Sequence, residues 1–501
     1  KRSDVERRSL RSRARGARRR EAMCLAAAAR GRPPWLLVAA AALAPDLAQA
    51  QQGGSPGPEA VAEHHPPLSV QRCAAGYGCS QEQLSVVLDA NWRQLVAPDG
   101  ETNCYEEGEW HAKHCADGAS CASGCSLVGL GPDDYRSTYG VESTGDSLKL
   151  KYVNPTGSIG SRLYLMDGES SYKMFNLKNR EFAFDVDVSN LPCGLNGALY
   201  LVEMKQDGGE GEGYNTAGAR YGTGYCDAQC PKDLHFVEGV ANVEGWDSEK
   251  QAGPAGSCCT EIDLWEANSV SAAFTGHPCS TQGPQQCSGV ECGDTELGAR
   301  YQGLCDKDGC DFNPWRMGSQ TFFGPGMTVD TTQPLTVVTQ FVTADGTDNG
   351  DLAEIRRYYV QNGRVIENPP SQVPGVPGNS ITDGFCEAQK QAFVATRSKE
   401  NPQGPFNHFA EKGGLRALGA ALDRGMVFVL SLWDDSQAGM LWLDATTPSD
   451  VPQASPGASR GPCSAATGEP AQERAQFPDA SAAFGNIRYG DLGSTTPGVP
   501  A

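Results

Sequence analysis

The stretch Glu261-Ile262-Asp263-Leu264-Trp265-Glu266-Ala267-Asn268 decides the interpretation of this chain. Two aliphatic residues alternate with Glu261, Asp263 and Trp265, which predicts a β-strand with one apolar face and one acidic face. Glu266 is five residues from Glu261 and therefore has the wrong parity for the acidic face. One extra residue, a β-bulge between Asp263 and Glu266, would return Glu266 to the side of Glu261. We therefore expect a bulged strand with three carboxylates on one face.

Two carboxylates about 5–5.5 Å apart are the arrangement by which retaining glycosidases cleave a glycosidic bond. One carboxylate attacks the anomeric carbon and the other protonates the leaving oxygen, and Glu261 and Glu266 are the candidates. On parity alone, a solvated strand edge with scattered acids explains the stretch as well. Two features favour catalysis: Cys258 and Cys259 lead directly into the strand, and Trp265 interrupts the acids.

The same stretch, preceded by Cys258-Cys259-Thr260, resembles the catalytic signature of glycoside hydrolase family 7, the fungal-type cellobiohydrolases and endoglucanases. The resemblance extends over residues 66–492. It is carried by further motifs at residues 191–200, 221–233, 241–246, 305–316, 335–341, 431–435 and 440–444.

Short runs typical of strands recur along the chain, separated by glycine-rich and cysteine-rich segments. Many strands with few helical patterns predict an all-β fold, a jelly-roll sandwich of two stacked antiparallel sheets. The long segments between the strands are expected to be disulfide-stapled loops that roof a substrate tunnel or cleft. A helix is expected over 415–422, and strands over 148–153, 182–188, 198–204, 335–343, 426–432 and 482–489.

Residues 1–50 are expected to be an N-terminal extension and secretory signal peptide. Residues 1–22 are rich in arginine, and Met23 is a candidate start. An apolar run covers 35–44, and Ala48-Gln49-Ala50 after it is a small-x-small cleavage site. A membrane anchor is the alternative, but the apolar run is too short to span a bilayer. We therefore expect a secreted, extracellular protein. Its parts would be a flexible N-terminus over 51–65, a catalytic domain over 66–492 and a short tail over 493–501, with no carbohydrate-binding module.

The charge of the chain is strongly negative once residues 1–50 are removed. Of the 41 Lys and Arg and the 61 Asp and Glu in the sequence, 29 and 57 remain, a net charge of −28. Such a surface repels nucleic acid and anionic membranes, so neither is an expected partner. The charge does not select a neutral polysaccharide, and a contribution to solubility is the simpler interpretation.

Nineteen cysteines in a secreted chain predict disulfides. Cys24 lies in the expected leader, which leaves an even number, and the sequence alone does not fix the pairing. Zinc ligation by Cys226-x3-Cys230 or Cys287-x4-Cys292 is the alternative, but secretion favours bridges, and no metal or cofactor is expected. The resemblance implies the pairs Cys73–Cys79, Cys104–Cys125, Cys115–Cys121, Cys193–Cys463, Cys226–Cys259, Cys230–Cys258, Cys279–Cys305, Cys287–Cys292 and Cys310–Cys386.

The resemblance also implies roles for four catalytic residues. Glu261 would be the nucleophile and Glu266 the acid/base, whose pKa must be raised so that it holds a proton. Asp263 would tune Glu261 through a shared proton or hydrogen bond. His277 matches a family histidine near the acid/base, and a purely structural histidine is the alternative.

The expected substrate is a chain of cellulose or a related β-1,4-glucan, bound by a monomer. Indoles stack on the flat faces of sugar rings, although tryptophans more often pack in cores. The resemblance implies substrate contacts for Trp92, Trp433, Trp442, Tyr200, Tyr225, Asn196, Asp227 and Gln229. It implies product-end contacts for Arg300, Arg316, Arg460, Asp308 and Asp311.

Exo or endo action depends on the loops that roof the groove. The roof segment 277–316 is present and the arginines match exo-acting members, which predicts a processive cellobiohydrolase working from reducing ends. Endoglucanase and glucan-remodelling transglycosylase activities are the alternatives. A non-catalytic glucan-binding protein would not need both glutamates.

Three departures from exo-acting members predict a partly open tunnel. Gln94 stands where an entrance tryptophan is common, and the segment between Trp246 and Glu261 is shorter. Ser436 and Gln437 replace a common roof tyrosine. An apparent insertion over 345–353 is expected to extend another loop.

Overall fold

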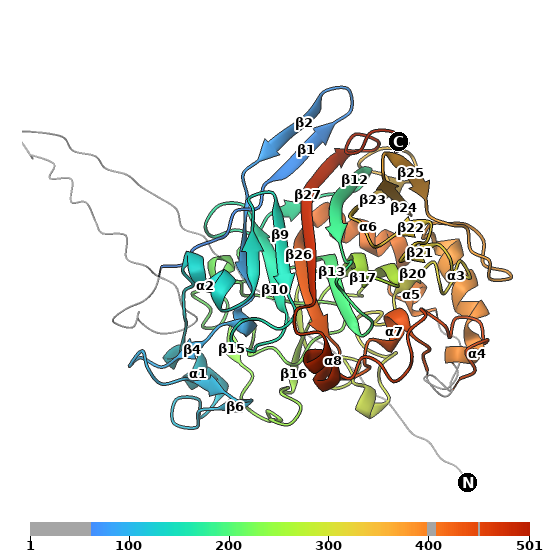
Figure 1. The fold of residues 1–501 in the computed structure, drawn as a ribbon. Coiled ribbons are helices and arrows are strands. Elements are labelled where there is room, and N and C mark those ends of the chain that lie inside the picture. The colour runs from blue at the N-terminus through green and yellow to red at the C-terminus, as the bar shows by residue number, and fades with distance from the viewer. Residues whose placement is uncertain (1–61, 398–406, 449–450) are drawn as a thin grey trace, which may run out of the picture. The chain divides into compact units, whose positions relative to one another are not determined.

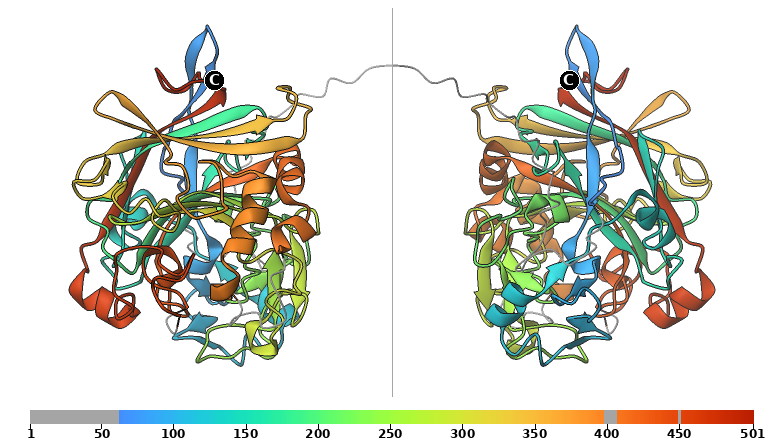
Figure 2. Two further views of the ribbon diagram at one scale, coloured as in Figure 1. Left: turned by 90° about the vertical axis from the view of Figure 1, so that its right-hand side faces the viewer. Right: turned by 90° about the vertical axis from the view of Figure 1, so that its left-hand side faces the viewer.

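Two large β-sheets form the framework of the structure. The computed structural model of the protein describes residues 62–397, 407–448 and 451–501, so the expected leader over residues 1–50 lies outside the described residues. The sheets have nine and eight strands and are named the outer and the inner sheet, respectively. Figures 1 and 2 show them as stacked layers. The predicted all-β sandwich is confirmed.

The outer sheet has the strand order β2–β1–β27–β12–β23–β24–β25, with β9 paired to β27 and β8 to β9. One pairing departs from the predicted antiparallel arrangement, because β1 runs parallel to β27 with Val70 opposite Ile487. These strands are far apart in the chain, so no tight turn forces them to be antiparallel. The strands are β1 (Val70–Ala74), β2 (Gly78–Glu82), β8 (Val141–Ser143), β9 (Ser147–Lys151), β12 (Arg180–Asp187), β23 (Leu335–Thr343), β24 (Leu352–Gln361), β25 (Arg364–Glu367) and β27 (Ser481–Asp491).

The inner sheet has the order β20–β18–β17–β13–β26–β10–β3, with β11 paired to β26. All its pairings are antiparallel. Its strands are β3 (Ser85–Leu88), β10 (Ser161–Met166), β11 (Met174–Phe175), β13 (Leu195–Val202), β17 (Glu261–Ala267), β18 (Ala272–His277), β20 (Cys310–Phe312) and β26 (Met426–Asp434).

Short elements occupy the connections between the large strands. The predicted helix over 415–422 is present as α6, slightly longer at both ends. The paired short strands are β4 (Leu95–Val96) with β7 (Ser126–Leu127), β5 (Tyr105–Glu106) with β6 (Glu109–Trp110), β14 (Phe236–Val237) with β15 (Val240–Ala241), β16 (Ala255–Cys258) with β19 (Gln285–Ser288), and β21 (Phe323–Gly324) with β22 (Val329–Asp330). The helices are α1 (Gly118–Gly124), α2 (Pro132–Ser137), α3 (Asp383–Ala392), α4 (Val394–Arg397), α5 (His408–Glu411), α6 (Gly414–Arg424), α7 (Leu441–Asp444) and α8 (Pro470–Gln476), with 3-10 turns at Ala90–Trp92, Ala219–Tyr221 and Thr295–Leu297.

The main core lies between the two sheets, because alternate side chains of each large strand point inward. Phe182 and Phe184 of β12 and Phe428 and Leu430 of β26 are all buried in one cluster. The rings of Phe182 and Phe428 have centroids 4.9 Å apart. A second buried cluster, which includes Tyr164, Tyr200 and Tyr225, packs on the other face of the inner sheet.

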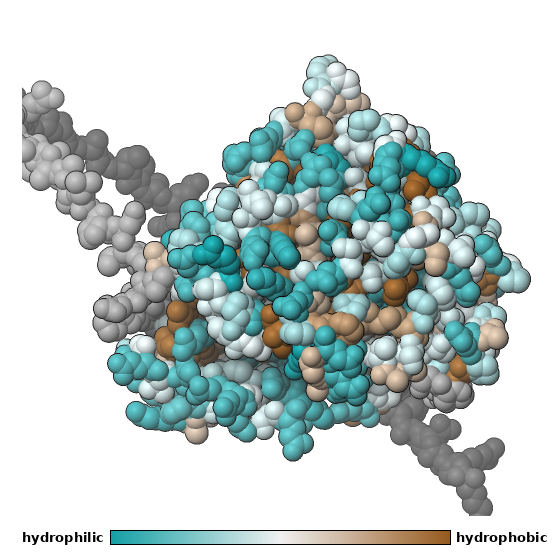
Figure 3. All heavy atoms as spheres, viewed as in Figure 1, coloured by the Kyte–Doolittle hydropathy of each residue, from teal (hydrophilic) through white to brown (hydrophobic). Residues whose placement is uncertain are grey.

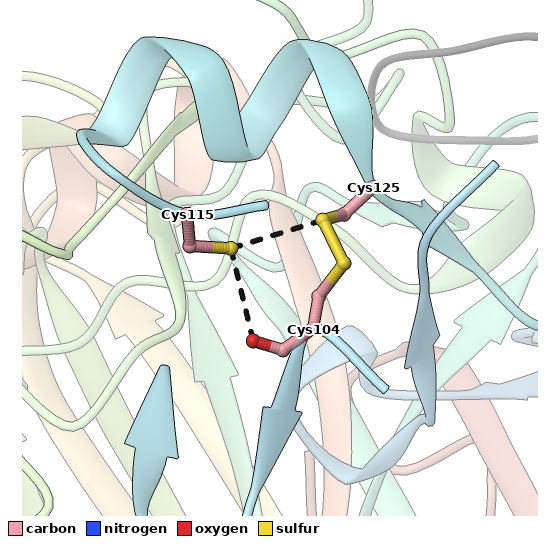
Figure 4. A group of neighbouring side chains, drawn as sticks. All are labelled: Cys104, Cys115 and Cys125. Atoms are coloured by element: carbon pink, nitrogen blue, oxygen red, sulfur yellow. Dashed lines mark hydrogen bonds between the residues drawn. A yellow bond between two sulfur atoms is a disulfide. The ribbon is translucent and has the colours of Figure 1, made fainter. Parts of the chain in front are cut away.

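The described residues form nine disulfides, and they are the nine pairs that the resemblance implies. The cysteines considered as zinc ligands all take part in these bridges. Two of these bridges are in contact. Figure 4 shows the Cys104–Cys125 bridge with the sulfur of Cys115 beside it, 3.7 Å from that of Cys125, and Cys115 is itself bridged to Cys121. The Cys193–Cys463 bridge spans the longest separation, 270 residues.

The segment before β1 is anchored rather than loose. Glu63 is buried, forms an ion pair with Arg93 at 2.6 Å and accepts a hydrogen bond from the Tyr135 hydroxyl at 2.9 Å. The flexible N-terminus expected over 51–65 is therefore wrong for its described end, because a buried carboxylate and guanidinium fix the chain there. Residues 51–61 lie outside the described residues.

The face of the protein shown in Figure 3 is mainly hydrophilic, with small, scattered apolar areas. Within residues 62–397, 407–448 and 451–501, no helix has the length and apolar character needed to cross a bilayer.

The segment 345–353, which the sequence predicts to be an insertion, forms most of the turn between β23 and β24 of the outer sheet and the start of β24. Arg180 pairs with Asp348 at 2.5 Å, and the Lys178 ammonium donates to the carbonyl of Gly350 at 2.9 Å. The insertion is therefore tied to β12 and the residues just before it, at the end of the outer sheet.

Candidate active site

Strand β17 contains the predicted bulge. Asp263 lies opposite Thr275 and Glu266 opposite Ala273, so three steps along β17 match two along β18. The pairing with β13 shifts at the same place. The prediction that Trp265 shares the acidic face is wrong, because the bulge changes the parity before that residue and sends its indole into the core. Trp265 is fully buried there, with its ring 5.7 Å from that of Phe323.

The two glutamates lie in a largely buried, acidic environment. Burial and the neighbouring Asp263 raise the pKa of both Glu261 and Glu266 well above the ordinary range. Each glutamate also accepts one hydrogen bond, which stabilises its charged form and so lowers its pKa. Glu261 accepts from the backbone N–H of Ala228 at 3.0 Å, and Glu266 from the amide of Asn196 at 3.2 Å.

Asp263 and His277 form an ion pair beside the glutamates, with Oδ2 and Nε2 3.1 Å apart. The other ring nitrogen, Nδ1, donates to the backbone carbonyl of Asp306 at 2.8 Å. Burial opposes protonation of this imidazole, but the hydrogen bond and charge of Asp263 outweigh it and raise the pKa of His277 to about 9. One imidazolium does not neutralise three carboxylates, so the cluster favours a proton on a glutamate. The site can therefore present an ionised and a protonated carboxyl group together.

Two tyrosine hydroxyls and one carboxylate form a network next to the backbone N–H that contacts Glu261. The hydroxyls of Tyr200 and Tyr225 are 2.9 Å apart, and Tyr225 donates to Asp227 at 2.7 Å. Asp227 also accepts from the backbone N–H of Gln229 at 2.7 Å, and burial raises its pKa. Because Ala228 lies between Asp227 and Gln229, this network fixes the N–H that contacts Glu261.

Trp92 lies beside Arg162, an arginine that local sequence patterns do not predict. Arg162 of β10 stacks on Tyr225, 3.4 Å from the ring centroid, and lies 5.1 Å from that of Trp92. Asp89 pairs with Arg162 at 2.6 Å. No motif marks Arg162, since its role depends on residues more than sixty positions away; only its polar character in an otherwise apolar strand was a signal.

Trp433, near the C-terminal end of strand β26, and Trp442 of α7 form a stacked pair. Their ring centroids are 6.1 Å apart and the rings are inclined by 27°. Both are partly exposed, and the Trp442 indole donates to Asp435 at 2.9 Å. Trp433 lies opposite Asn196 in the sheet, so this pair is linked to the residue that contacts Glu266.

The predicted product-end residues form two groups. In the first, Asp311 pairs with Arg316, and Arg460 Nη1 lies 4.0 Å from Asp311 Oδ2. Burial opposes ionisation of Asp311, but Arg316 and Arg460 outweigh it and lower its pKa to about 2. Arg316 is buried, so it mainly holds Asp311, whereas Arg460 is partly exposed.

The second group joins Arg300 and Asp308, whose side chains are 2.9 Å apart. Asp308 lies two residues before Cys310, the first residue of β20, and Asp311 is the second residue of that strand, so both groups lie near one edge of the inner sheet.

The three predicted departures lie in exposed or constrained loops. Gln94 is exposed and bonds to Asn103, and Ser436 and Gln437 are exposed in the turn after β26. The segment between Trp246 and Glu261 is held by β16, which pairs with β19 of the roof segment 277–316.

The charged His277 predicts a pH-dependent stability. Its pKa is raised from an ordinary value of about 6.5 to about 9 in the fold. The stability it contributes is therefore complete below about pH 6.5 and is lost as pH rises through 9. Between about pH 6.5 and 8 we expect the free energy of unfolding to fall by about 2 kcal/mol in the native protein. Chemical unfolding at each pH checks this.

The decrease in the free energy of unfolding between about pH 6.5 and 8 should be smaller in His277→Gln. It should be retained in His235→Gln. Burial lowers the pKa of His235 to about 4, so that residue is neutral throughout the window. An unchanged slope in His277→Gln would contradict the assignment.

Comparisons with known proteins agree with the resemblance. The family model described as glycosyl hydrolase family 7 matches residues 58–496. A cellobiohydrolase from Daphnia pulex is 44% identical with a TM-score of 0.84, over 88% of this chain and 99% of that one. A cellobiohydrolase from Melanocarpus albomyces complexed with cellotetraose is 44% identical with a TM-score of 0.80, over 89% and 99%. A Humicola insolens endocellulase is 37% identical with a TM-score of 0.72, over 87% and 98%.

Proposed function

Because the chain belongs to glycosyl hydrolase family 7, we propose that it is a secreted cellulase that cleaves the β-1,4-glucosidic bonds of cellulose with retention of configuration. The observation that carries this proposal is the bulged strand β17, with three carboxylates next to an imidazolium. The similar structures include enzymes named as cellobiohydrolases and an endocellulase.

In the proposed first step, ionised Glu261 attacks the anomeric carbon while protonated Glu266 gives its proton to the leaving oxygen. The hydrogen bond from Ala228 holds Glu261 in place for the attack. Asp263, bonded to His277, is available to orient the nucleophile.

In the proposed second step, water releases the sugar from the ester at Glu261. The ester is neutral, so its former charge no longer raises the pKa of Glu266. Glu266 then remains ionised and takes a proton from the attacking water. Two inversions at the same carbon give net retention.

The stereochemistry of the first product tests the retaining mechanism. Proton NMR of early products from a soluble cello-oligosaccharide is expected to show the β-anomer before mutarotation. An α-anomer as the first product would contradict a nucleophilic role for Glu261 and favour a water attack with inversion.

For the mode of action, we propose a cellobiohydrolase that works from reducing ends through a partly open tunnel. Support comes from the tethered roof segment 277–316 and from the partly exposed Arg300 and Arg460 near one edge of the sheet. Cellobiose should be the main soluble product and should inhibit the enzyme. A broad spread of longer oligosaccharides without cellobiose inhibition would instead support endoglucanase activity, which the exposed Gln94, Ser436 and Gln437 favour.

Gln94 offers a direct test of chain entry. The binding free energy of a sugar ring stacked on an indole should resemble that of a base stacked on an aromatic ring in a nucleic-acid groove, about 1–3 kcal/mol. Gln94→Trp is therefore expected to raise the rate on crystalline cellulose and to lower the viscosity loss on carboxymethyl cellulose. Gln81→Trp serves as the control, because Gln81 is also exposed but lies on β2 of the outer sheet, away from the roof loops. No change in either assay would place Gln94 outside the substrate path.

A further inference from the structure

Arg357 is a buried arginine of the outer sheet that reaches across the core to the catalytic strand. It belongs to β24 and is 2% exposed, on the same face as the buried Ile355 and Tyr359. Its Nη2 donates a hydrogen bond to the backbone carbonyl of Leu264, in the bulge of β17. The contact therefore joins the two sheets at the bulge that separates Asp263 from Glu266.

The carbonyl of Leu264 lies where both hydrogen-bonded ladders are interrupted. Towards β13, the pairing passes from Trp265 to Asp263 and skips Leu264. Towards β18, it passes from Glu266 to Asp263 and skips Leu264 again. A bulge leaves such a residue without ladder partners, and a buried carbonyl needs a donor from elsewhere. Arg357 supplies that donor.

The remainder of the guanidinium is not arranged for stability. It stacks on Phe274 of β18, 4.3 Å from the ring centroid, and lies 5.9 Å from the ring centroid of Tyr359, whose side chain favours the charged guanidinium. Nε and Nη1 have no close hydrogen-bond partner among the described residues. No carboxylate is paired with it in the described part of the chain. A buried cation with so few partners costs folding free energy, and an apolar side chain of similar volume is often as good or better. The neighbouring Arg356 contrasts with it, since it is partly exposed and paired with Glu354 at 2.8 Å.

We propose that Arg357 is a positioning residue that maintains the bulge of β17 and thereby keeps Glu266 on the same face as Glu261 and Asp263. The proposal rests on the proposed function, in which Glu261 and Glu266 are the reacting pair. Side chains alternate along a strand, so a β17 without the bulge would turn Glu266 towards the core. Arg357 thus acts through the strand and not on the substrate.

The test is Arg357→Met, which keeps most of the volume and removes the donor. We expect kcat on a soluble cello-oligosaccharide to fall by about 10²–10⁴-fold, because that is the usual contribution of a general acid and base and Glu266 would no longer reach the leaving oxygen. KM should change little, and the limbs of the pH–rate profile should move. The melting temperature should change little, because removal of a poorly partnered buried cation offsets the cost of leaving the Leu264 carbonyl without a donor. Arg357→Lys should recover part of the lost kcat, because its ammonium can donate to the same carbonyl. Arg356→Met is the matched control and should behave like the native enzyme.

A crystal structure of Arg357→Met provides a readout that does not depend on activity. A changed register between β17 and β18, with Glu266 displaced, would support the proposal. A native register together with native kcat and pH profile would overturn it, and so would an equal loss of kcat in Arg356→Met. If Arg357→Met does not fold, Arg357→Lys and Arg357→Gln replace it in the test. A native kcat in both of these variants would also overturn the proposal. Full activity in Glu261→Gln, by contrast, would refute the proposed function and leave the link between Arg357 and the bulge untouched.

Discussion

Replacement of Glu261 by glutamine is expected to lower kcat by about 10⁵-fold, equivalent to about 7 kcal/mol of barrier. The amide keeps the shape and accepts the hydrogen bond from the Ala228 N–H, but it does not attack the anomeric carbon. Substrate binding should survive, because the aromatic residues on either side of the cluster are unaffected. Steady-state kinetics and equilibrium binding of a cello-oligosaccharide measure the two effects separately.

Glu266→Gln provides the matched comparison for this prediction. General acid–base catalysis contributes about 10²–10⁴-fold, so its loss of kcat should be smaller, and smallest with a leaving group that needs no proton. A strongly activated aryl cellobioside should therefore rescue the first step in Glu266→Gln and not in Glu261→Gln. Equal behaviour of the two variants with both kinds of leaving group would contradict the division of roles.

Removal of the Cys193–Cys463 bridge should have the largest effect on stability. The bridge spans 270 residues and joins the segment before β13 to the segment after α7. The entropy of the unfolded chain rises with the length of the opened loop, which gives roughly 5 kcal/mol for this bridge and roughly 2 kcal/mol for the six-residue Cys73–Cys79 loop. Small proteins have only about 5–15 kcal/mol of net stability, so the first loss is severe.

The two double-alanine variants, each lacking one bridge, test this order in guanidinium unfolding. Cys73→Ala with Cys79→Ala should fold and unfold at a modestly lower denaturant concentration. Cys193→Ala with Cys463→Ala should lose much more, and should lose activity first because Asn268 and Gly194 both bond to Asp444 close to that bridge. Equal losses in the two variants would show that local packing, rather than loop length, governs these bridges.

Local alternation predicted much of the fold and the acidic face of β17. The bulge followed from the parity of Glu261 and Glu266, and the structure confirms it. Parity requires one extra residue but does not identify which residue absorbs it, and for that reason Trp265 was assigned to the wrong face. The choice depends on packing against Phe184 and Phe323, which are distant in sequence.

Features that depend on distant partners were beyond prediction from local patterns. Arg162 and Arg357 are charged residues on buried faces of their strands, and their partners come from distant segments: Asp89 before a 3-10 turn for Arg162, and Leu264 of β17 for Arg357. The disulfide pairing came from the resemblance, because eighteen cysteines permit very many connectivities. The anchoring of Glu63 was missed because a polar segment looks loose when its buried partner, Arg93, is thirty residues away.

The parallel pairing of β1 with β27 has a consequence for the order of events during synthesis. β27 contacts β1, β9 and β12, so the last described strand completes the sheet that the first one begins. While the ribosome is still making residues before 481, those three strands lack their shared neighbour and expose unpaired backbone edges. Completion of the outer sheet therefore waits until nearly all of the described chain has emerged, a long-range closure that is intrinsically slow. During this interval the unpaired edges are open to pairing with other chains, so the chain is most prone to aggregate before β27 is in place.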